Sequence, residues 1–250
     1  MLVLTACGCQ TSHEGVKINF SALLRAYRER LDRKPGRAET DRVLASLKPE
    51  QLNDLGVIYE REGRLEKAAW AYRQAIHKNL WYATAHVNLG NVLRKQGRTE
   101  EALDRYRKAM SVAPHNLEAT NNFADLCAQQ GVHLEEAIAR LSPLVDNGGP
   151  HRVYGLDTLG WLYHLSGDDH RAAATLQTAL EEADERDHVL GLTLHEHLAA
   201  VYRALKQDRK AEQHEADARR LKALIEAREL REQEDNSQTK GGELVGEDSP

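Results

Sequence analysis

Residues 49–82 read PEQLNDLGVIYEREGRLEKAAWAYRQAIHKNLWY and residues 83–116 read ATAHVNLGNVLRKQGRTEEALDRYRKAMSVAPHN, two consecutive stretches of equal length that decide the fold. When the two stretches are aligned, Gly56 falls on Gly90 and Tyr72 falls on Tyr106. Self-similarity at a fixed period of about 20–50 residues is typical of arrays in which each unit stacks on its neighbours. We therefore expect a repeat architecture.

The same period continues toward the C-terminus in four alignment columns. The columns are Gly63, Gly97, Gly131; Ala68, Ala102, Ala137, Ala172; Tyr72, Tyr106, Leu141, Leu176; and Ala75, Ala109, Leu144, Ala179. Within each unit, apolar residues recur three and four positions apart, which predicts two amphipathic helices joined by a glycine turn. Small residues also recur at a fixed offset, as in Gly90 and Ala102. We expect such pairs to face each other where the two helices of a unit approach closely.

These units resemble the tetratricopeptide repeat, whose pattern is W-x₂-L-G-x₂-Y…A-x₃-F…A…P. The first unit matches it with Leu52, Leu55, Gly56, Tyr59, Ala68, Tyr72 and Ala75. The resemblance implies an all-α fold, a right-handed superhelix (α-solenoid) of about five helical hairpins with an N-terminal capping hairpin and a long C-terminal helix. The predicted boundaries are 1–18 for a signal remnant and linker, 19–48 for the capping hairpin, 49–222 for the array (49–82, 83–116, 117–152, 153–191 and 192–222), 223–233 for the C-terminal helix extension and 234–250 for an acidic disordered tail.

Near the N-terminus, Leu4-Thr5-Ala6-Cys7 resembles the lipobox of bacterial lipoproteins, in which the cysteine thiol accepts diacylglycerol. Such a signal needs an apolar segment of about 7–15 residues, so we expect a start upstream of Met1 if the motif is used. In that family, a residue such as Gly8 after the acylated cysteine implies sorting to the outer membrane. The predicted location is therefore the bacterial outer membrane, lipid-anchored through Cys7 on the periplasmic side. The alternative is a cytoplasmic protein with a coincidentally apolar N-terminus.

Composition and motifs argue against several classes of function. The chain has 34 Lys and Arg against 39 Asp and Glu, a net charge of −5 that argues against binding nucleic acid. His195 and His197 do not form the H-E-x-x-H zinc motif, because only one residue separates them. Side chains two positions apart point to different sides of a helix. We expect no catalytic residue, no metal site, no cofactor and no small-molecule substrate. Cys127 is predicted to be a buried, inert thiol.

A partner is expected in the concave groove, which the first helix of each unit lines in tetratricopeptide arrays. The predicted partner is a protein or peptide segment, and the best groove candidates are Asn88, Asn91, Arg94, Asn121, Asn122, Asp125, Tyr154 and Trp161. Further residues at groove positions are Asn53, Glu60, Arg61 and Lys95.

Two of these candidates carry specific hypotheses. Asn88 and Asn122 occupy the same position of adjacent units and resemble an asparagine ladder, whose amides pair with a ligand backbone; the corresponding residues elsewhere are Asp54, Thr158 and His197. The alternative is that these amides bond only within the array. Trp161 is either a binding hot spot or stacks on a neighbouring helix.

The predicted function is a non-enzymatic interaction scaffold, a lipid-anchored adaptor of the bacterial envelope. The alternative is a soluble cytoplasmic adaptor, either chaperone-like or regulatory.

Overall fold

The computed structural model describes residues 20–33, 36–148 and 151–242, and their side chains except at 20–24 and 233–242. In these ranges every regular element is a helix and none is a strand, which confirms the predicted all-α class. None of these helices combines the length and apolar character that crossing a membrane requires. The predicted lipidation site, Cys7, lies outside the described residues.

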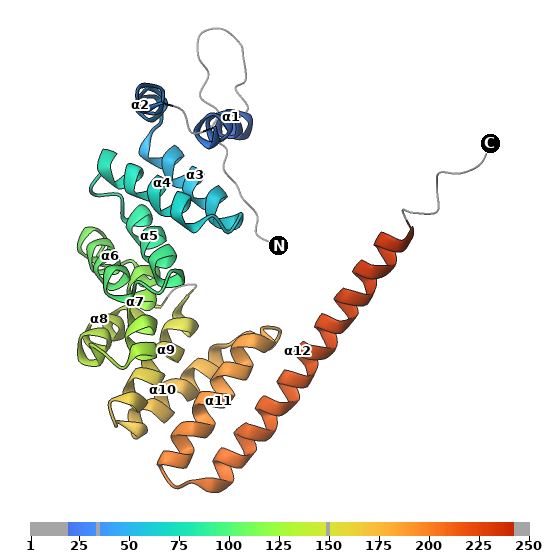
Figure 1. Ribbon diagram of the computed structural model, residues 1–250. Coiled ribbons are helices and arrows are strands. Elements are labelled where there is room, and N and C mark those ends of the chain that lie inside the picture. Colours follow the sequence, from blue (N-terminus) through green and yellow to red (C-terminus); the bar gives the residue numbers. More distant parts are fainter. Residues whose placement is uncertain (1–19, 34–35, 149–150, 243–250) are drawn as a thin grey trace, which may run out of the picture. The chain divides into compact units, whose positions relative to one another are not determined.

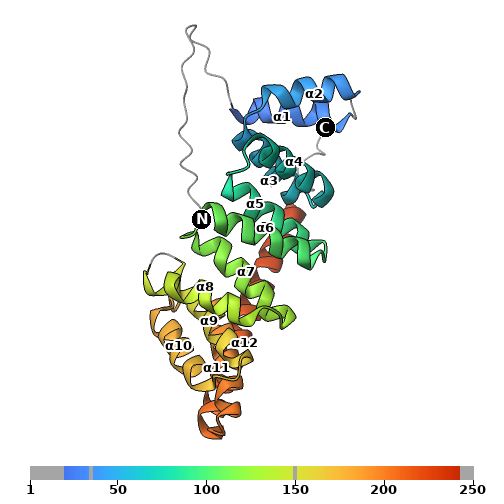
Figure 2. The same ribbon diagram turned by 90° about the vertical axis from the view of Figure 1, so that its left-hand side faces the viewer.

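The chain divides into two compact units, Met1–Val112 (unit 1) and Ala113–Pro250 (unit 2), and each is described by itself. Unit 1 consists of consecutive helix pairs (Figures 1 and 2). Its helices are α1 (Phe20–Asp32), α2 (Arg37–Ser46), α3 (Pro49–Arg61), α4 (Leu65–Lys78), α5 (Ala83–Lys95) and α6 (Thr99–Val112). Gly63 and Gly97 lie in the α3–α4 and α5–α6 turns with φ of 71° and 72°, a conformation that glycine adopts without steric cost.

Unit 2 continues the paired arrangement. Its helices are α7 (Leu117–Gln130), α8 (Leu134–Asp146), α9 (Arg152–Leu165), α10 (Asp169–Glu182), α11 (His188–Ala204) and α12 (Asp208–Gly242). Helix α11 begins four residues before the predicted unit boundary at 192. The reason is an N-cap, because the Asp187 carboxylate accepts the backbone N–H of Leu190 at 3.1 Å and so fixes the first turn.

The repeated columns form the core of the two units. The alanine and aromatic columns of α4, α6, α8 and α10 are fully buried, as are Leu52, Leu55 and Tyr59 of α3. Cys127 is also buried, as predicted. One column differs: Val145 is buried in α8, whereas the predicted Leu144 is only half-buried. Positions three and four residues beyond a buried residue lie on the same helix face, so the repeat spacing alone does not distinguish the two.

The repeated glycines have a different neighbour from the one that the sequence suggests. A Cβ added to Gly56 would lie 2.4 Å from Cε1 of Tyr72, and one added to Gly90 would lie 2.5 Å from Cε1 of Tyr106. The nearest neighbours of Gly56 and Gly90 are therefore these tyrosine rings and not the expected Ala68 and Ala102. Each glycine therefore makes room for an aromatic ring of the second helix, a contact between a small and a large residue rather than between two small ones.

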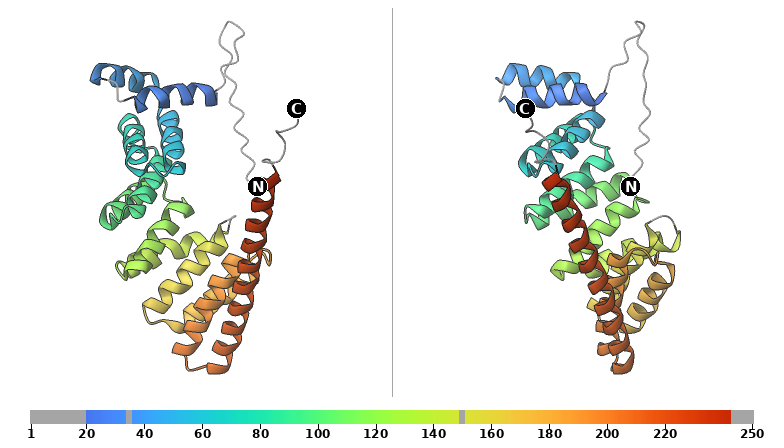
Figure 3. Two further views of the ribbon diagram at one scale, coloured as in Figure 1. Left: turned by 45° about the vertical axis from the view of Figure 1, so that its right-hand side comes forward. Right: turned by 90° about the vertical axis from the view of Figure 1, so that its right-hand side faces the viewer.

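Helix α12 runs well beyond its partner α11, as Figure 3 shows. It packs against α11 through buried Ala211 and Ala218, and its side chains from Glu226 to Glu232 are all exposed. The helix ends at Gly242, so the boundary predicted at residue 233 lies inside it. Extending an existing helix costs far less free energy than starting a new one. The polar composition after residue 233 therefore does not end the helix.

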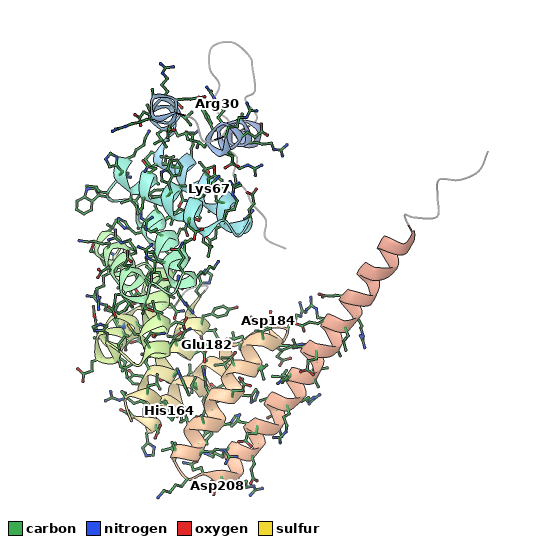
Figure 4. All side chains as sticks on the ribbon, viewed as in Figure 1. Arg30, Lys67, His164, Glu182, Asp184 and Asp208 are labelled. Atoms are coloured by element: carbon green, nitrogen blue, oxygen red, sulfur yellow. The ribbon has the colours of Figure 1, made fainter. Side chains whose placement is uncertain are left out.

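The first helix is fixed to the array by ionic contacts. Asp32 at the end of α1 accepts hydrogen bonds from Arg64 at 2.6 and 2.7 Å, from Lys67 at 2.6 Å and from the Tyr59 hydroxyl at 3.2 Å. The Arg64 guanidinium and the Lys67 ammonium lower the pKa of Asp32 well below its ordinary value, although partial burial opposes them. Figure 4 places Lys67 on α4 and Arg30 on α1. Arg30 also pairs with Glu39 of α2 at 3.3 Å, which joins the two capping helices.

We predict that Gly90→Ala destabilises the protein by about 1–3 kcal/mol, the usual cost of forcing extra atoms into a packed core. The Tyr106 ring is fully buried and has little space to move away from the new methyl group. Gly36→Ala is the matched control, because nothing lies within 4 Å of a Cβ at that position. Urea unfolding measures both variants. Equal stability of the two would contradict the proposed Gly90–Tyr106 contact.

Candidate functional site

A surface hollow of about 300 Å³ lies between α3 and α5 of unit 1, and we call it the α3–α5 groove. It is lined by Val57, Glu60, Arg61, Tyr72, Asn88, Asn91 and Lys95. All but Tyr72 come from the first helices of two adjacent repeats, the helices that the sequence predicts to line a binding surface. The lining combines two amides, one carboxylate, two cations and a phenol.

The carboxylate of Glu60 connects both sides of the groove. It accepts the hydroxyl of Tyr72 at 2.9 Å and the ammonium of Lys95 at 2.7 Å. Burial of the phenol, and next the charge of Glu60, raise the pKa of Tyr72 well above its ordinary value, so this hydroxyl stays protonated and donates. Tyr72 reaches Glu60 because its ring passes beside Gly56. The glycine thus positions a polar group in the groove floor.

An amide pair links the two repeats within this groove. The Nδ2 of Asn88 donates to the Oδ1 of Asn53 at 2.9 Å, and Asn53 is 6% exposed. The sequence predicts Asp54 as the neighbour of Asn88 in an asparagine ladder, but the structure places Asn53 there. Burial raises the pKa of the Asp54 carboxyl. The contact of Asn88 within the array, one of the two predicted alternatives, is therefore present.

The other two predicted residues of α5 differ in their surroundings. Asn91 lines the groove, and its Oδ1 accepts the hydroxyl of Tyr106 at 2.8 Å. In both hairpins a tyrosine of the second helix thus bonds a residue of the first, although Asn91 lies three residues before the position equivalent to Glu60. Arg94 is half-buried on α5 and is not part of the groove lining.

The remaining candidates, from Asn121 to Trp161, belong to unit 2. Asn121, Asn122 and Asp125 are all half-buried on α7. The carboxylate of Asp125 accepts the side-chain amide of Gln129 at 3.1 and 3.2 Å. These three residues share a helix, as expected.

Tyr154 of α9 is 46% exposed, and its hydroxyl donates to Asp187 at 2.9 Å. That hydrogen bond raises the pKa of the Tyr154 phenol. Tyr154 therefore presents an exposed ring whose hydroxyl is already paired.

Trp161 of α9 stacks on a neighbouring helix, the second of its two predicted roles. Its ring lies 4.3 Å from the ring of His197 on α11 at an interplanar angle of 15°. Nδ1 of His197 is bonded to Asp157 at 2.7 Å. The ring of Trp161 also lies 4.8 Å from that of His164, whose Nδ1 is 2.5 Å from the Asp169 carboxylate. Figure 4 labels His164 at the end of α9.

From the sequence, His195 and His214 are interpreted as solvated or groove-lining histidines. The structure brings their Nδ1 atoms to 2.9 Å, with the carboxylate of Asp217 beside them. One sequence feature does point to this cluster: His214 and Asp217 are three residues apart and therefore lie on one face of a helix. The sequence does not give the register of α11 against α12, and this register brings His195 to the other two side chains.

Comparison with known proteins agrees with the repeat assignment. Two tetratricopeptide-repeat family models match residues 81–142 and 156–190. The chain therefore contains tetratricopeptide repeats, which form protein–protein interaction scaffolds. No curated protein matches the sequence.

Solved structures share the fold at low sequence identity. PilW, described as a widely conserved type IV pilus biogenesis factor, has a TM-score of 0.61 at 17% identity, over 69% of this chain and 77% of that one. PilF of Pseudomonas aeruginosa has a TM-score of 0.58 at 21% identity, over 72% and 86%. MamA of Desulfovibrio magneticus has a TM-score of 0.61 at 15% identity, over 70% and 96%. These similarities show the fold alone.

We predict that Asn88→Ala lowers the free energy of unfolding by about 1–3 kcal/mol, because it leaves the buried Oδ1 of Asn53 without its donor. Asn53→Ala and the double variant complete a double-mutant cycle, measured by urea unfolding. We expect the double variant to lose less stability than the sum of the single ones. Additive losses would show that the two amides do not interact.

Proposed function

We propose that this tetratricopeptide-repeat protein is a non-enzymatic adaptor that binds an extended peptide segment of a partner protein in the α3–α5 groove. The observation that carries the proposal is the groove lining, in which amides and paired charges from two adjacent repeats surround one hollow. Such a surface offers hydrogen bonds without a nucleophile or an acid–base pair aimed at a substrate.

The groove chemistry suits a polypeptide backbone. The Oδ1 of Asn88 makes no hydrogen bond within the described part of the chain, and its Nδ2 uses one of two hydrogens on Asn53. An amide with one donor and one acceptor to spare matches the C=O and N–H of an extended chain. Packed helices lie roughly 8–10 Å apart and an extended chain advances about 3.3 Å per residue. A ligand that crosses from α3 to α5 therefore spans about three residues.

Exposed Arg61 supplies charge at the edge of the groove, whereas Glu60 and Lys95 are already paired with each other. Binding an acidic or amide side chain of the ligand at Arg61 needs no internal bond to be broken. We therefore assign Arg61 the recognition of a ligand side chain and Asn88 the recognition of the ligand backbone.

We further propose that the adaptor is held at the bacterial outer membrane, facing the periplasm, by acylation of Cys7. The lipobox resemblance of Leu4-Thr5-Ala6-Cys7 supports this location. One acyl chain gives only weak, reversible membrane attachment, so the multiple acylation that the resemblance implies is what makes the anchor stable. A soluble cytoplasmic adaptor is the alternative.

The groove proposal is tested by cross-linking in cells. A photo-reactive amino acid at Val57, inside the groove, should capture a partner, and the same group at exposed Arg73 on α4 should not. With the captured partner purified, Arg61→Ala should weaken its binding about tenfold, the value of a hydrogen bond to a charged group. Arg73→Ala is the matched control and should bind like the wild type. Equal capture at both positions would exclude the groove as the binding surface.

The anchoring proposal is tested by fractionating cells that express the native gene. Cys7→Ser should move the protein from the membrane to the soluble fraction, because it removes the acceptor thiol. Cys9→Ser is the matched control and should leave the protein with the membrane. Mass spectrometry of the native protein reports the modification directly. An unmodified Cys7 in the intact protein would support the cytoplasmic alternative.

A further inference from the structure

We propose that His195, His214 and Asp217 form a binding site for a divalent transition-metal ion of the zinc type, joining α11 to α12. The ligand atoms of the three side chains lie within 4.8 Å of one another. We call this set the α11–α12 histidine cluster. It is separate from the α3–α5 groove and belongs entirely to unit 2.

Helix packing brings the three groups together. His214 and Asp217 are three residues apart on α12 and therefore share one of its faces, and His195 faces them from α11. Figures 3 and 4 show α11 and α12 running side by side in opposite directions from the turn that precedes Asp208. Buried Ala211 and Ala218 on α12 hold the two helices close on either side of the cluster. The ligands are thus carried by two packed helices rather than by a loop.

The distances fit a small coordination polyhedron. The Nδ1 atoms of the two histidines are 2.9 Å apart, and Oδ2 of Asp217 is 4.0 Å from Nδ1 of His195. Zinc–nitrogen bonds of about 2.0–2.1 Å in tetrahedral geometry separate two nitrogen ligands by roughly 3.3–3.4 Å. The pair of rings opens by a few tenths of an ångström to admit the ion, and Asp217 moves slightly inward.

The chemical state of the rings suits a metal ion. When both imidazoles are neutral, Nδ1–H of one ring donates a hydrogen bond to the Nδ1 lone pair of the other. The two Nδ1 atoms therefore already face each other. Neutral imidazole is the form that binds a metal. When a dication binds both Nδ1 atoms, the hydrogen that they shared moves through solvent to Nε2 of the same ring, and the carboxylate of Asp217 becomes a charged ligand.

The surroundings hold the ligands in place and leave a way in. The ring of Tyr202 stacks on His214 at 5.5 Å with an interplanar angle of 8°, and its hydroxyl accepts the side-chain amide of Gln177 at 2.5 Å. The side chain of His195 is 15% exposed and that of Asp217 is 44% exposed. Solvent therefore reaches the cluster past Asp217, and the fourth position of a tetrahedral ion is open to water. Two imidazoles and one carboxylate are a donor set that zinc accepts.

The test uses the full chain, treated with a chelator and then titrated with ZnCl₂ in a calorimeter. We expect one ion per chain and a rise in melting temperature on binding, because the ion joins two helices of the folded state. CoCl₂ should give the visible absorption bands of a tetrahedral site. Asp217→Asn should weaken zinc binding at least tenfold. Its side chain is 44% exposed and Asn has almost the same shape, so the fold should be retained, which circular dichroism checks.

His214→Gln removes a second ligand and should weaken binding further. His170→Gln is the matched control, because His170 is an exposed histidine of α10 outside the cluster. It should bind zinc like the wild type. Zinc binding that is equal in the wild type and in folded Asp217→Asn and His214→Gln variants would overturn the proposal. So would the absence of stoichiometric binding to the wild type, which would leave the cluster a histidine–histidine hydrogen bond.

Discussion

The contact of a first-helix glycine with a second-helix aromatic ring is the constraint on which each complete hairpin of unit 1 depends. Gly56 faces Tyr72 and Gly90 faces Tyr106, and both rings are fully buried. A glycine inside a helix costs about 1 kcal/mol relative to alanine. Burying a large apolar side chain stabilises the fold by about 1.5–3 kcal/mol. The ring therefore outweighs the helix penalty, and the glycine is retained because any side chain at that position would displace it.

That same contact determines the polar chemistry of the groove. Because each tyrosine ring crosses the first helix at a glycine, its hydroxyl emerges on the opposite side and bonds a groove residue, Glu60 or Asn91. In the hairpin of α9 and α10, Leu176 lies against Gly160 and no hydroxyl is present. On α9 the residue after Gly160 is Trp161, on which His197 of α11 stacks while His164 of α9 lies beside it at a tilt. In unit 1 the same tyrosine side chain thus packs its ring in the core and places its hydroxyl in or beside the groove.

Three histidines of unit 2, His195, His197 and His214, lie between neighbouring helices. His197 of α11 bonds Asp157 of α9, and His195 of α11 meets His214 of α12. Imidazole suits such positions because it carries a donor and an acceptor on a flat ring that also stacks. For His195 and His214, burial keeps the pKa below its ordinary value. Their Nδ1 atoms lie 2.9 Å apart, which suits a shared hydrogen bond or a shared metal ion.

The sequence by itself determined the helical class, the pairing of helices and the repeated positions of the core, because a period of about 34 residues and helical spacing restrict all three. It also placed Asn88, Asn91, Glu60 and Lys95 on the groove side of their helices. Only the tertiary structure decided what each of these residues contacts. The partner of Gly90, the Asn53–Asn88 pair and the α11–α12 histidine cluster all depend on how far one helix slides and rotates against the next. A shift of a single residue changes these contacts, and no local spacing in the sequence records it.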